Sequence, residues 1–160
     1  MRVLDILSAD RVSVANAAEG LVHSKLEALV RLAALLARGQ TVVPPAEIER
    51  VLEERERLQS TGVGGGVAIP HGAIDRVDRI IGAVLLCPSG VEFDAIDGAP
   101  VMILVAVIGP KRATGEHLKT LARVSRLLRD DAFRTRLLSS PTGKDAFNLI
   151  ALEEGQAPQP

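Results

Sequence analysis

The chain has 160 residues, of which 47% are hydrophobic, 24% charged and 2% aromatic, and 19 Lys and Arg against 20 Asp and Glu give a formal charge of −1. This length and hydrophobic content suffice for one globular domain that folds without disulfides or a metal. The near-neutral charge and the few aromatic side chains argue against direct binding of nucleic acid.

Cellular location is indicated by what the chain lacks. The single cysteine, Cys87, cannot form an internal disulfide or a cysteine-based zinc cluster, which indicates a reducing compartment. The longest apolar runs, 80–87 and 101–108, are far shorter than the roughly 20 residues of a membrane span. An acid, Asp5, stands where a signal peptide would be apolar. We therefore expect a cytoplasmic protein without membrane insertion.

Two helices are predicted in the first 60 residues. Apolar residues recur at helical spacing over 24–38, a segment that opens with the capping-box pattern Ser-x-x-Glu at Ser24 and is followed by Gly39. The second helix spans 44–58. It opens with two prolines, which suit a first helical turn, and its charges lie mostly on one side, as is typical of a surface helix.

Three strands are predicted, at 67–70, 80–87 and 101–108. Each is short, rich in β-branched residues and bounded by Gly or Pro, and the last two are apolar on both alternating faces. Strands of this kind lie in the middle of a sheet that is covered on both sides.

The C-terminal third is predicted to be helical over 114–129, 131–138 and 142–152. The polar, proline-containing segment 153–160 is predicted to be a disordered tail. Helices and strands interleave without a repeat or an internal linker, so we predict a single α/β domain over residues 1–152 with its elements in layers.

A glycine-rich stretch is the first candidate for a functional loop. Gly62, Gly64, Gly65 and Gly66 fall within five positions, which gives the backbone access to positive φ and allows another group to approach closely. A Walker or dinucleotide-binding loop follows a strand and opens a helix. This stretch instead follows a predicted helix and leads into a predicted strand, so a nucleotide-binding loop is not indicated.

His71 stands directly after this stretch, between Pro70 and Gly72. Proline keeps Ile69 extended, and the missing side chain of Gly72 is expected to leave the imidazole uncrowded. A lone histidine is often a surface residue without a chemical role. The glycine-rich approach and the Pro-His-Gly context favour a histidine displayed for chemistry.

The other two histidines differ in context. His117 falls in the first turn of the helix predicted at 114–129, where the positive end of the helix dipole attracts anions and disfavours protonation of an imidazole. The alternative for His117 is a boundary residue at the edge of the apolar face. His23 lies just before the Ser24 cap with no chemistry-bearing residues around it, and no role is assigned to it.

Two histidines beside a glycine loop, without an acid triad, suit phosphoryl transfer better than acyl transfer. One ring nitrogen can accept the phosphoryl group while hydrogen-bond donors hold its oxygens, and neither a metal nor a cofactor is required. A zinc site is the competing interpretation. No Cys has metal-ligand spacing to these histidines, but acidic ligands stay open as candidates: Asp75, Asp78, Asp94 and Asp97.

The stretch Arg-Glu-Arg-Leu-Gln-Ser-Thr-Gly-Val-Gly-Gly-Gly-Val-Ala-Ile-Pro-His-Gly at 55–72 resembles the phosphorylation-site segment of fructose/mannitol-type enzyme IIA domains of the bacterial phosphotransferase system. The resemblance continues through 90–101 and 116–118 and covers most of the chain from about residue 4 to 152. Within this family, the sequence is most similar to the nitrogen-regulatory branch.

The resemblance implies a mixed β-sheet with helices on both faces. It also implies that His71 accepts a phosphoryl group from a histidine phosphocarrier protein and that Arg55 and His117 flank this group. On its residue type alone, Arg55 is a solvated charge. The loop around the phosphoryl group is assigned to five glycines: Gly62, Gly64, Gly65, Gly66 and Gly72.

The expected function is that of a phosphotransferase component that regulates partner proteins by its phosphorylation state. A sugar-specific IIA that passes the phosphoryl group to a IIB domain is the alternative within the same chemistry. From another class, the protein could be a non-enzymatic binding module, with His71 forming part of a contact surface. Oligomeric state and downstream partners are not predicted.

Overall fold

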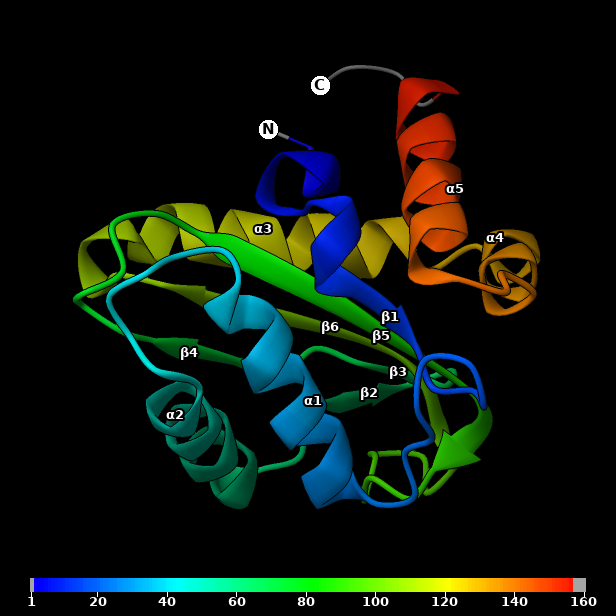
Figure 1. Ribbon diagram of the computed structural model, residues 1–160, viewed down its shortest axis with the longest axis horizontal. Helices are drawn as coiled ribbons and strands as arrows, with labels where there is room; N and C mark the ends of the chain where they lie inside the picture. The colour runs from blue at the N-terminus through cyan, green and yellow to red at the C-terminus, as the bar shows by residue number, and fades with distance from the viewer. Residues whose placement is uncertain (1, 157–160) are drawn as a thin grey trace.

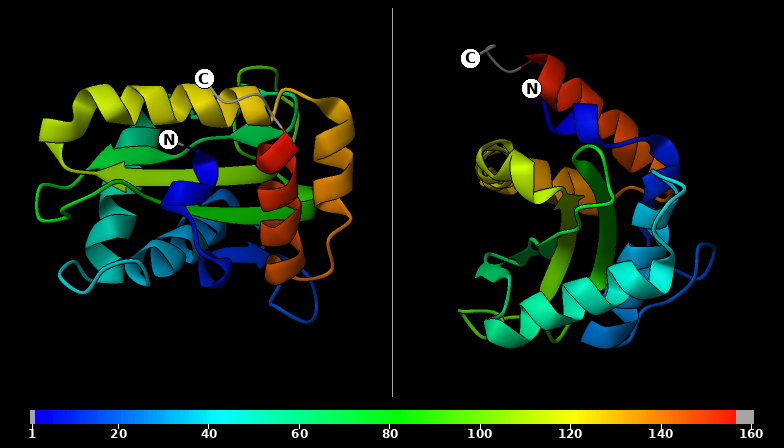
Figure 2. Two further views of the ribbon diagram at one scale, coloured as in Figure 1. Left: turned by 90° about the horizontal axis from the view of Figure 1, so that it is seen from above. Right: turned by 90° about the vertical axis from the view of Figure 1, so that its left-hand side faces the viewer.

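A mixed β-sheet lies between two layers of helices in the computed structural model, which describes residues 2–156 (Figures 1 and 2). The strand order is β1-β5-β6-β3-β2, and β4 also pairs with β6. β5 and β6 are antiparallel, whereas β1, β3 and β4 run parallel to their partners. The strands are β1 Val12–Val14, β2 Gly62–Gly64, β3 Val67–Ala68, β4 His71–Ala73, β5 Ile81–Val91 and β6 Val101–Gly109.

The helices divide between the two faces of the sheet. Helices α1 (Lys25–Ala37) and α2 (Pro45–Leu58) cover one face. The other face is covered by α3 (Thr114–Leu127), α4 (Asp131–Leu138), α5 (Gly143–Gln156) and the 3-10 helix η1 (Val3–Ile6). Two further 3-10 turns, η2 (Ala9–Arg11) and η3 (Lys111–Ala113), connect elements. The expected single α/β domain with helices on both faces is confirmed.

Two hydrophobic clusters, one on each face, explain why the central strands are apolar throughout. Successive residues of a strand point to opposite faces. Leu85 and Leu104 accordingly belong to the cluster between the sheet and helices α1 and α2, whereas Leu86 and Val105 belong to the cluster between the sheet and helices α3, α4 and α5. Complete burial of a leucine stabilises the fold by about 1.5–3 kcal/mol before entropy is counted.

The predicted helices all form, α4 over the expected range and the others with shifts at their ends. Ser24 caps α1 by accepting a hydrogen bond from the backbone N–H of Glu27 at 3.1 Å. The prediction of a disordered tail from residue 153 is wrong for residues 153–156, which continue α5 because its helical hydrogen bonding runs on. The remaining residues of that predicted tail, 157–160, lie outside the described residues.

The strand predicted at 67–70 is shorter than expected because Pro70 interrupts it. β3 and β4 pair with consecutive parts of β6, at Ile103 and at Val107. Pro70 stands between them, where it has no N–H to donate, but its carbonyl accepts from Val107 N at 2.9 Å. His71 is therefore the first residue of a strand that stays aligned with the central sheet.

The first and last elements are joined by one carboxylate. Glu154 of α5 accepts hydrogen bonds from the backbone N–H groups of Val3 and Leu4 of η1, at 2.8 and 2.7 Å. These N–H groups would otherwise be unsatisfied at the start of η1. None of the helices within residues 2–156 has the length and apolar character needed to cross a membrane.

Candidate functional site

Strand alternation turns His71 towards α3. Val67 and Ile69 belong to the hydrophobic cluster on the α3 face, and His71, two residues further on, projects in the same direction. Gly72 points the other way, because a Cβ placed on it would overlap the side chain of Val51 in α2. The predicted reason for Gly72 is therefore wrong: the glycine lets α2 pack against β4, and it does not relieve crowding of the imidazole.

A backbone carbonyl orients the ring of His71. Nδ1 of His71 lies 2.8 Å from the carbonyl oxygen of Ile69. A carbonyl can only accept a hydrogen bond, so this contact requires the proton of the neutral ring on Nδ1. The lone pair is then on Nε2, the nitrogen available for bond formation.

His117 lies beside His71. The two ring centroids are 5.7 Å apart and the ring planes are inclined by 60°. Burial and, secondarily, the neighbouring His71 lower the pKa of His117 below its ordinary value. Its Nε2 atom is buried and has no hydrogen-bond partner among the described residues, so a neutral imidazole here has an unused polar atom close to His71.

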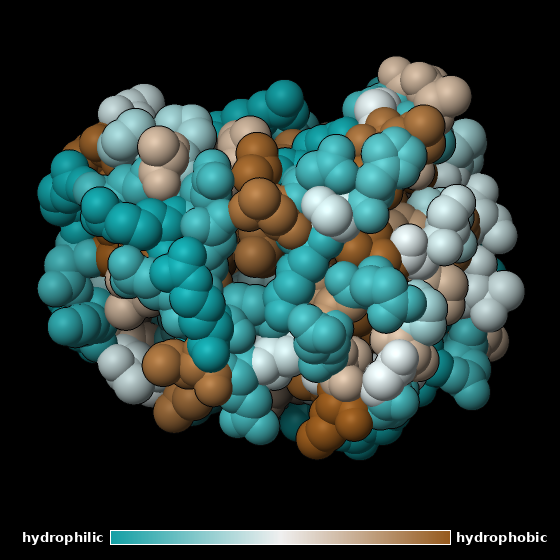
Figure 3. Space-filling view, turned by 90° about the horizontal axis from the view of Figure 1, so that it is seen from below, coloured by the Kyte–Doolittle hydropathy of each residue, from teal (hydrophilic) through white to brown (hydrophobic). Residues whose placement is uncertain are grey.

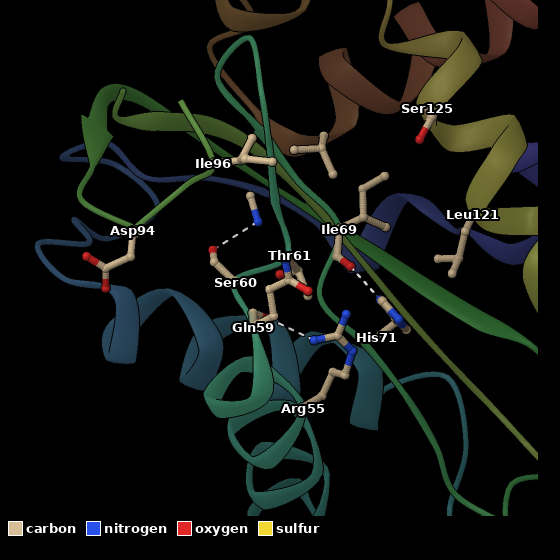
Figure 4. A pocket seen from close by; sticks show the side chains of 12 residues that line it. Arg55, Gln59, Ser60, Thr61, Ile69, His71, Asp94, Ile96, Leu121 and Ser125 are labelled. Atoms are coloured by element: carbon tan, nitrogen blue, oxygen red, sulfur yellow. Dashed lines mark hydrogen bonds between the residues drawn. The ribbon is translucent and has the colours of Figure 1, made fainter. Parts of the chain in front are cut away.

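A pocket of about 520 Å³ opens at the edge of the sheet, between the end of α2 and α3. Arg55 and His71 both line it, and in the close-up their side chains point towards the same space (Figure 4). Arg55 donates one N–H to the carbonyl of Gln59 at 2.8 Å, which leaves other guanidinium N–H groups for an anion. Leu121 and Ser125 of α3 form the opposite wall.

The glycine-rich stretch has a structural role that was not expected. Of the five predicted loop glycines, Gly62 lines the pocket, whereas Gly64 ends β2 and Gly65 and Gly66 form the turn between β2 and β3. These three have φ values of 95°, 66° and 77°, which explains why they are glycines. The group that approaches the turn is internal, because Asp97 accepts a hydrogen bond from Gly65 N at 3.1 Å.

Gly62 is required by close packing. A Cβ at this position would come within 2.6 Å of the Cβ of Ala95, in the segment that follows β5. Gly62 also accepts a hydrogen bond from Ile96 N at 3.2 Å. The close contact brings Asp94 and Ile96 to the wall of the pocket.

One buried acid next to the site was not predicted from the sequence. Glu56 follows Arg55 on α2, and only 6% of its surface is exposed. The signal was present, because Ile48, Leu52 and Glu56 are spaced by four residues and so share the buried face of the helix. Ser125 and Ile96 also line the pocket, although neither was assigned to the site.

Two of the four acids considered as metal ligands bind backbone N–H groups, whereas Asp94 lies on the wall of the pocket. Asp75 accepts a hydrogen bond from Lys111 N at 2.9 Å, and Asp97 is bound to Gly65. Over residues 2–156, no group of three His, Cys, Asp or Glu side chains is arranged to hold a metal ion.

The layered fold, with its pair of histidines at the edge of a mixed sheet, is that of the enzyme IIA class of proteins. Residues 6–152 match the family described as "Phosphoenolpyruvate-dependent sugar phosphotransferase system, EIIA 2". The chain belongs to this family, which confirms the resemblance inferred from the sequence.

Relatives include proteins named "Nitrogen regulatory protein". The one from Pseudomonas aeruginosa is 37% identical over 157 residues, which are 98% of this chain and 99% of that protein. The one from Bradyrhizobium diazoefficiens is 37% identical over 85% of this chain and 88% of its own length. The crystal structure of nitrogen regulatory protein IIA-Ntr from Neisseria meningitidis superimposes with a TM-score of 0.82 at 31% identity, covering 92% of this chain and 98% of that chain.

Proposed function

We propose that the protein accepts a phosphoryl group on Nε2 of His71 from a phosphorylated histidine phosphocarrier protein. The observation that carries this proposal is the hydrogen bond from Nδ1–H of His71 to the carbonyl of Ile69. It leaves the Nε2 lone pair as the nucleophile, and it also stabilises the positive charge that develops on the ring as Nε2 forms a bond.

The transfer of the phosphoryl group from the donor to His71 needs no cofactor. The Nε2 lone pair of His71 forms a bond to phosphorus while the P–N bond of the donor breaks, and its electron pair returns to the donor's ring nitrogen. The proton on Nδ1 of His71 stays in its hydrogen bond to Ile69. Arg55 and His117 donate hydrogen bonds to the phosphoryl oxygens, and the first turn of α3 adds the positive end of its helix dipole.

Exposed hydrophobic residues near the pocket support a protein as the donor. Val63 and Ile96 line the pocket and are 56% and 79% exposed. Leu58 and Leu118, which adjoin Gln59 and His117 in the chain, are 82% and 63% exposed. Exposed apolar side chains around a polar centre are typical of a protein docking surface.

Phosphorylation adds roughly −1.5 to −2 charges at this surface. Because the unmodified chain has a formal charge of −1, such a change alters which partner surfaces are complementary to it. We propose that the protein regulates partners in this way, as the names of its relatives suggest, and that it does so in the cytoplasm, in keeping with the free, buried thiol of Cys87.

Labelling from phosphoenolpyruvate through purified carrier enzymes tests the proposal. We expect acid-labile label on the wild type and on the His23→Ala variant, whose altered residue is exposed and remote in sequence from the site, and none on His71→Ala. Label that survives in His71→Ala, or a wild type without label, refutes the proposal.

A sugar-specific role is the second candidate, because the family description names the sugar phosphotransferase system. In that case, label on His71 would pass rapidly to a IIB domain. Retention of the label in the presence of IIB domains, together with partner binding that differs between labelled and unlabelled protein, favours the regulatory role.

A further inference from the structure

A buried carboxylate, that of Glu56, follows Arg55 directly on α2 and lies on the buried face of the helix. The side chain of Glu56 is 4% exposed. Burial of a carboxylate is unfavourable unless hydrogen bonds and an opposite charge compensate for the lost water. The neighbouring acids on α2 avoid this cost, since the side chains of Glu53 and Glu54 are 23% and 61% exposed.

Three donors converge on Glu56. The backbone N–H of Thr61 lies 3.1 Å from each carboxylate oxygen, and the Thr61 hydroxyl donates at 2.5 Å. The ammonium group of Lys25, the first residue of α1, forms an ion pair with Glu56 at 2.8 Å. Glu56 thus binds the segment that follows α2 to the start of α1.

The contacts continue from Thr61 to the acceptor histidine. The carbonyl of Thr61 accepts from Ile69 N at 3.0 Å, and the carbonyl of Ile69 accepts from Nδ1 of His71 at 2.8 Å. Thr61 and Ile69 each donate their backbone N–H to one partner and accept with their carbonyl from the next. A displacement of Thr61 therefore moves the carbonyl that fixes the tautomer of His71.

A second set of contacts holds the same segment against the loop after β5. Both Lys25 Nζ and the hydroxyl of Ser60 donate to the carbonyl of Phe93, at 3.1 and 2.9 Å. The Lys25 ammonium also lies 4.8 Å from the centroid of the fully buried Phe93 ring. Lys25, the ion-pair partner of Glu56, is thus itself held against the hydrophobic core.

We propose that Glu56 is a positioning residue for the acceptor histidine: through Thr61 and Ile69, it keeps His71 in the tautomer with its proton on Nδ1 and its lone pair on Nε2. This rests on the proposed function of His71 for its consequence in phosphoryl transfer. The effect on the tautomer does not require phosphorylation, so it can be measured on the unmodified protein.

The test is Glu56→Gln, with Glu53→Gln as the matched control one turn earlier on α2. The amide has one acceptor oxygen where three donors converge, and its NH₂ group faces another donor. We expect the share of the Nε2–H tautomer of His71, measured by ¹⁵N NMR of the ring, to rise about fivefold, as for loss of one ordinary hydrogen bond. We expect the rate constant of phosphoryl transfer at saturating carrier to fall about tenfold with little change in KM.

Thr61→Val and Thr61→Ser provide a second test that leaves the buried charge pair in place. Valine removes only the hydroxyl donor to Glu56, and serine restores it. We expect a smaller tautomer shift in Thr61→Val and the wild-type tautomer in Thr61→Ser.

A folded Glu56→Gln protein with the wild-type tautomer and transfer rate overturns the proposal, as does an equal effect of Glu53→Gln. If Glu56→Gln does not fold, a wild-type tautomer in Thr61→Val overturns it. A wild type that accepts no phosphoryl group refutes the function proposed for His71, whereas the tautomer shift still reports on Glu56.

Discussion

The rings of His71 and His117 meet with their centroids 5.7 Å apart, one from an edge strand and the other from the first turn of α3. Burial and, to a smaller extent, the neighbouring His71 lower the pKa of His117 below its ordinary value. His117 is thus favoured as a neutral ring that can donate an N–H, next to His71, whose contact with the carbonyl of Ile69 leaves the lone pair on Nε2.

Replacement of His117 should slow transfer without changing the acceptor. His117→Ala removes the donor beside His71, and loss of one such donor slows reactions by about 10²-fold. Glutamine retains an N–H donor, so His117→Gln should recover part of the rate. Quenched-flow labelling measures both variants, and peptide mapping should find the label still on His71. A wild-type rate in His117→Ala would exclude His117 from the site.

The free energy of unfolding should fall below neutral pH because of His117. The pKa of His117 is lowered in the fold, so the unfolded chain binds its proton more readily. The contribution of His117 is therefore fully present above about pH 6.5, its ordinary pKa, and is lost as the pH falls through the lower folded value. Urea unfolding from pH 8 to 5 measures this dependence.

His117→Asn, which does not titrate, should flatten this part of the pH dependence. The control is His23→Asn, at an exposed position, which should retain the wild-type slope. An unchanged slope in His117→Asn would mean that other groups cause the acid destabilisation.

The helices were predictable from the sequence because their signals are local. The range predicted for α4, Asp131 to Leu138, is the observed one, and the Ser24 cap of α1 forms as expected. The three residues of β1 are a strand only because they pair with β5, at Val12 and Val84 for example. No local pattern specifies a pairing over that separation.

At the site, the residue types were predictable and the contacts were not. Positive φ in the glycine turn was inferred correctly, but the approaching group is Asp97 of the same chain. Pro-His-Gly indicated a displayed histidine, yet the direction of His71 depends on its alternation with Ile69 in a strand aligned to β6. Such relationships arise from tertiary packing.

Cys87 should be unreactive in the native protein. It is buried on the central strand β5, and burial raises the pKa of its thiol to about 11. The reactive thiolate is therefore scarce at pH 8, and reagent cannot reach it. Titration with a chromogenic disulfide should detect one thiol per chain in denaturant and almost none without it. Rapid native labelling would contradict this expectation.

Gly143 should be sensitive to even a methyl group. A Cβ there would overlap the carbonyl oxygen of Val12, where the start of α5 packs on β1. Because backbone cannot move aside as a side chain can, Gly143→Ala should lower the free energy of unfolding by about 3 kcal/mol or more. Gly155→Ala, with no atom within 4 Å of the added Cβ, is the control and should be neutral or stabilising. Urea unfolding compares the two variants.

Exposed apolar groups are distributed unevenly over the surface. On the face seen from below, hydrophobic side chains form separate patches among hydrophilic ones (Figure 3). Individual exposed apolar residues are ordinary on a protein surface. Those next to the pocket, Val63 and Ile96, differ in having a chemical centre beside them.

The carboxylate of Glu154 holds the N-terminal 3-10 helix against the last helix of the fold. It joins η1 to α5, and α5 packs on β1, the edge strand opposite the one that carries the glycine turn. A fluorophore on α5 would therefore be sensitive to loss of the contact between η1 and α5. On α5, which packs on β1, the fluorophore would be separated from His71 on β4 by the two central strands β5 and β6, so it would not cover the pocket.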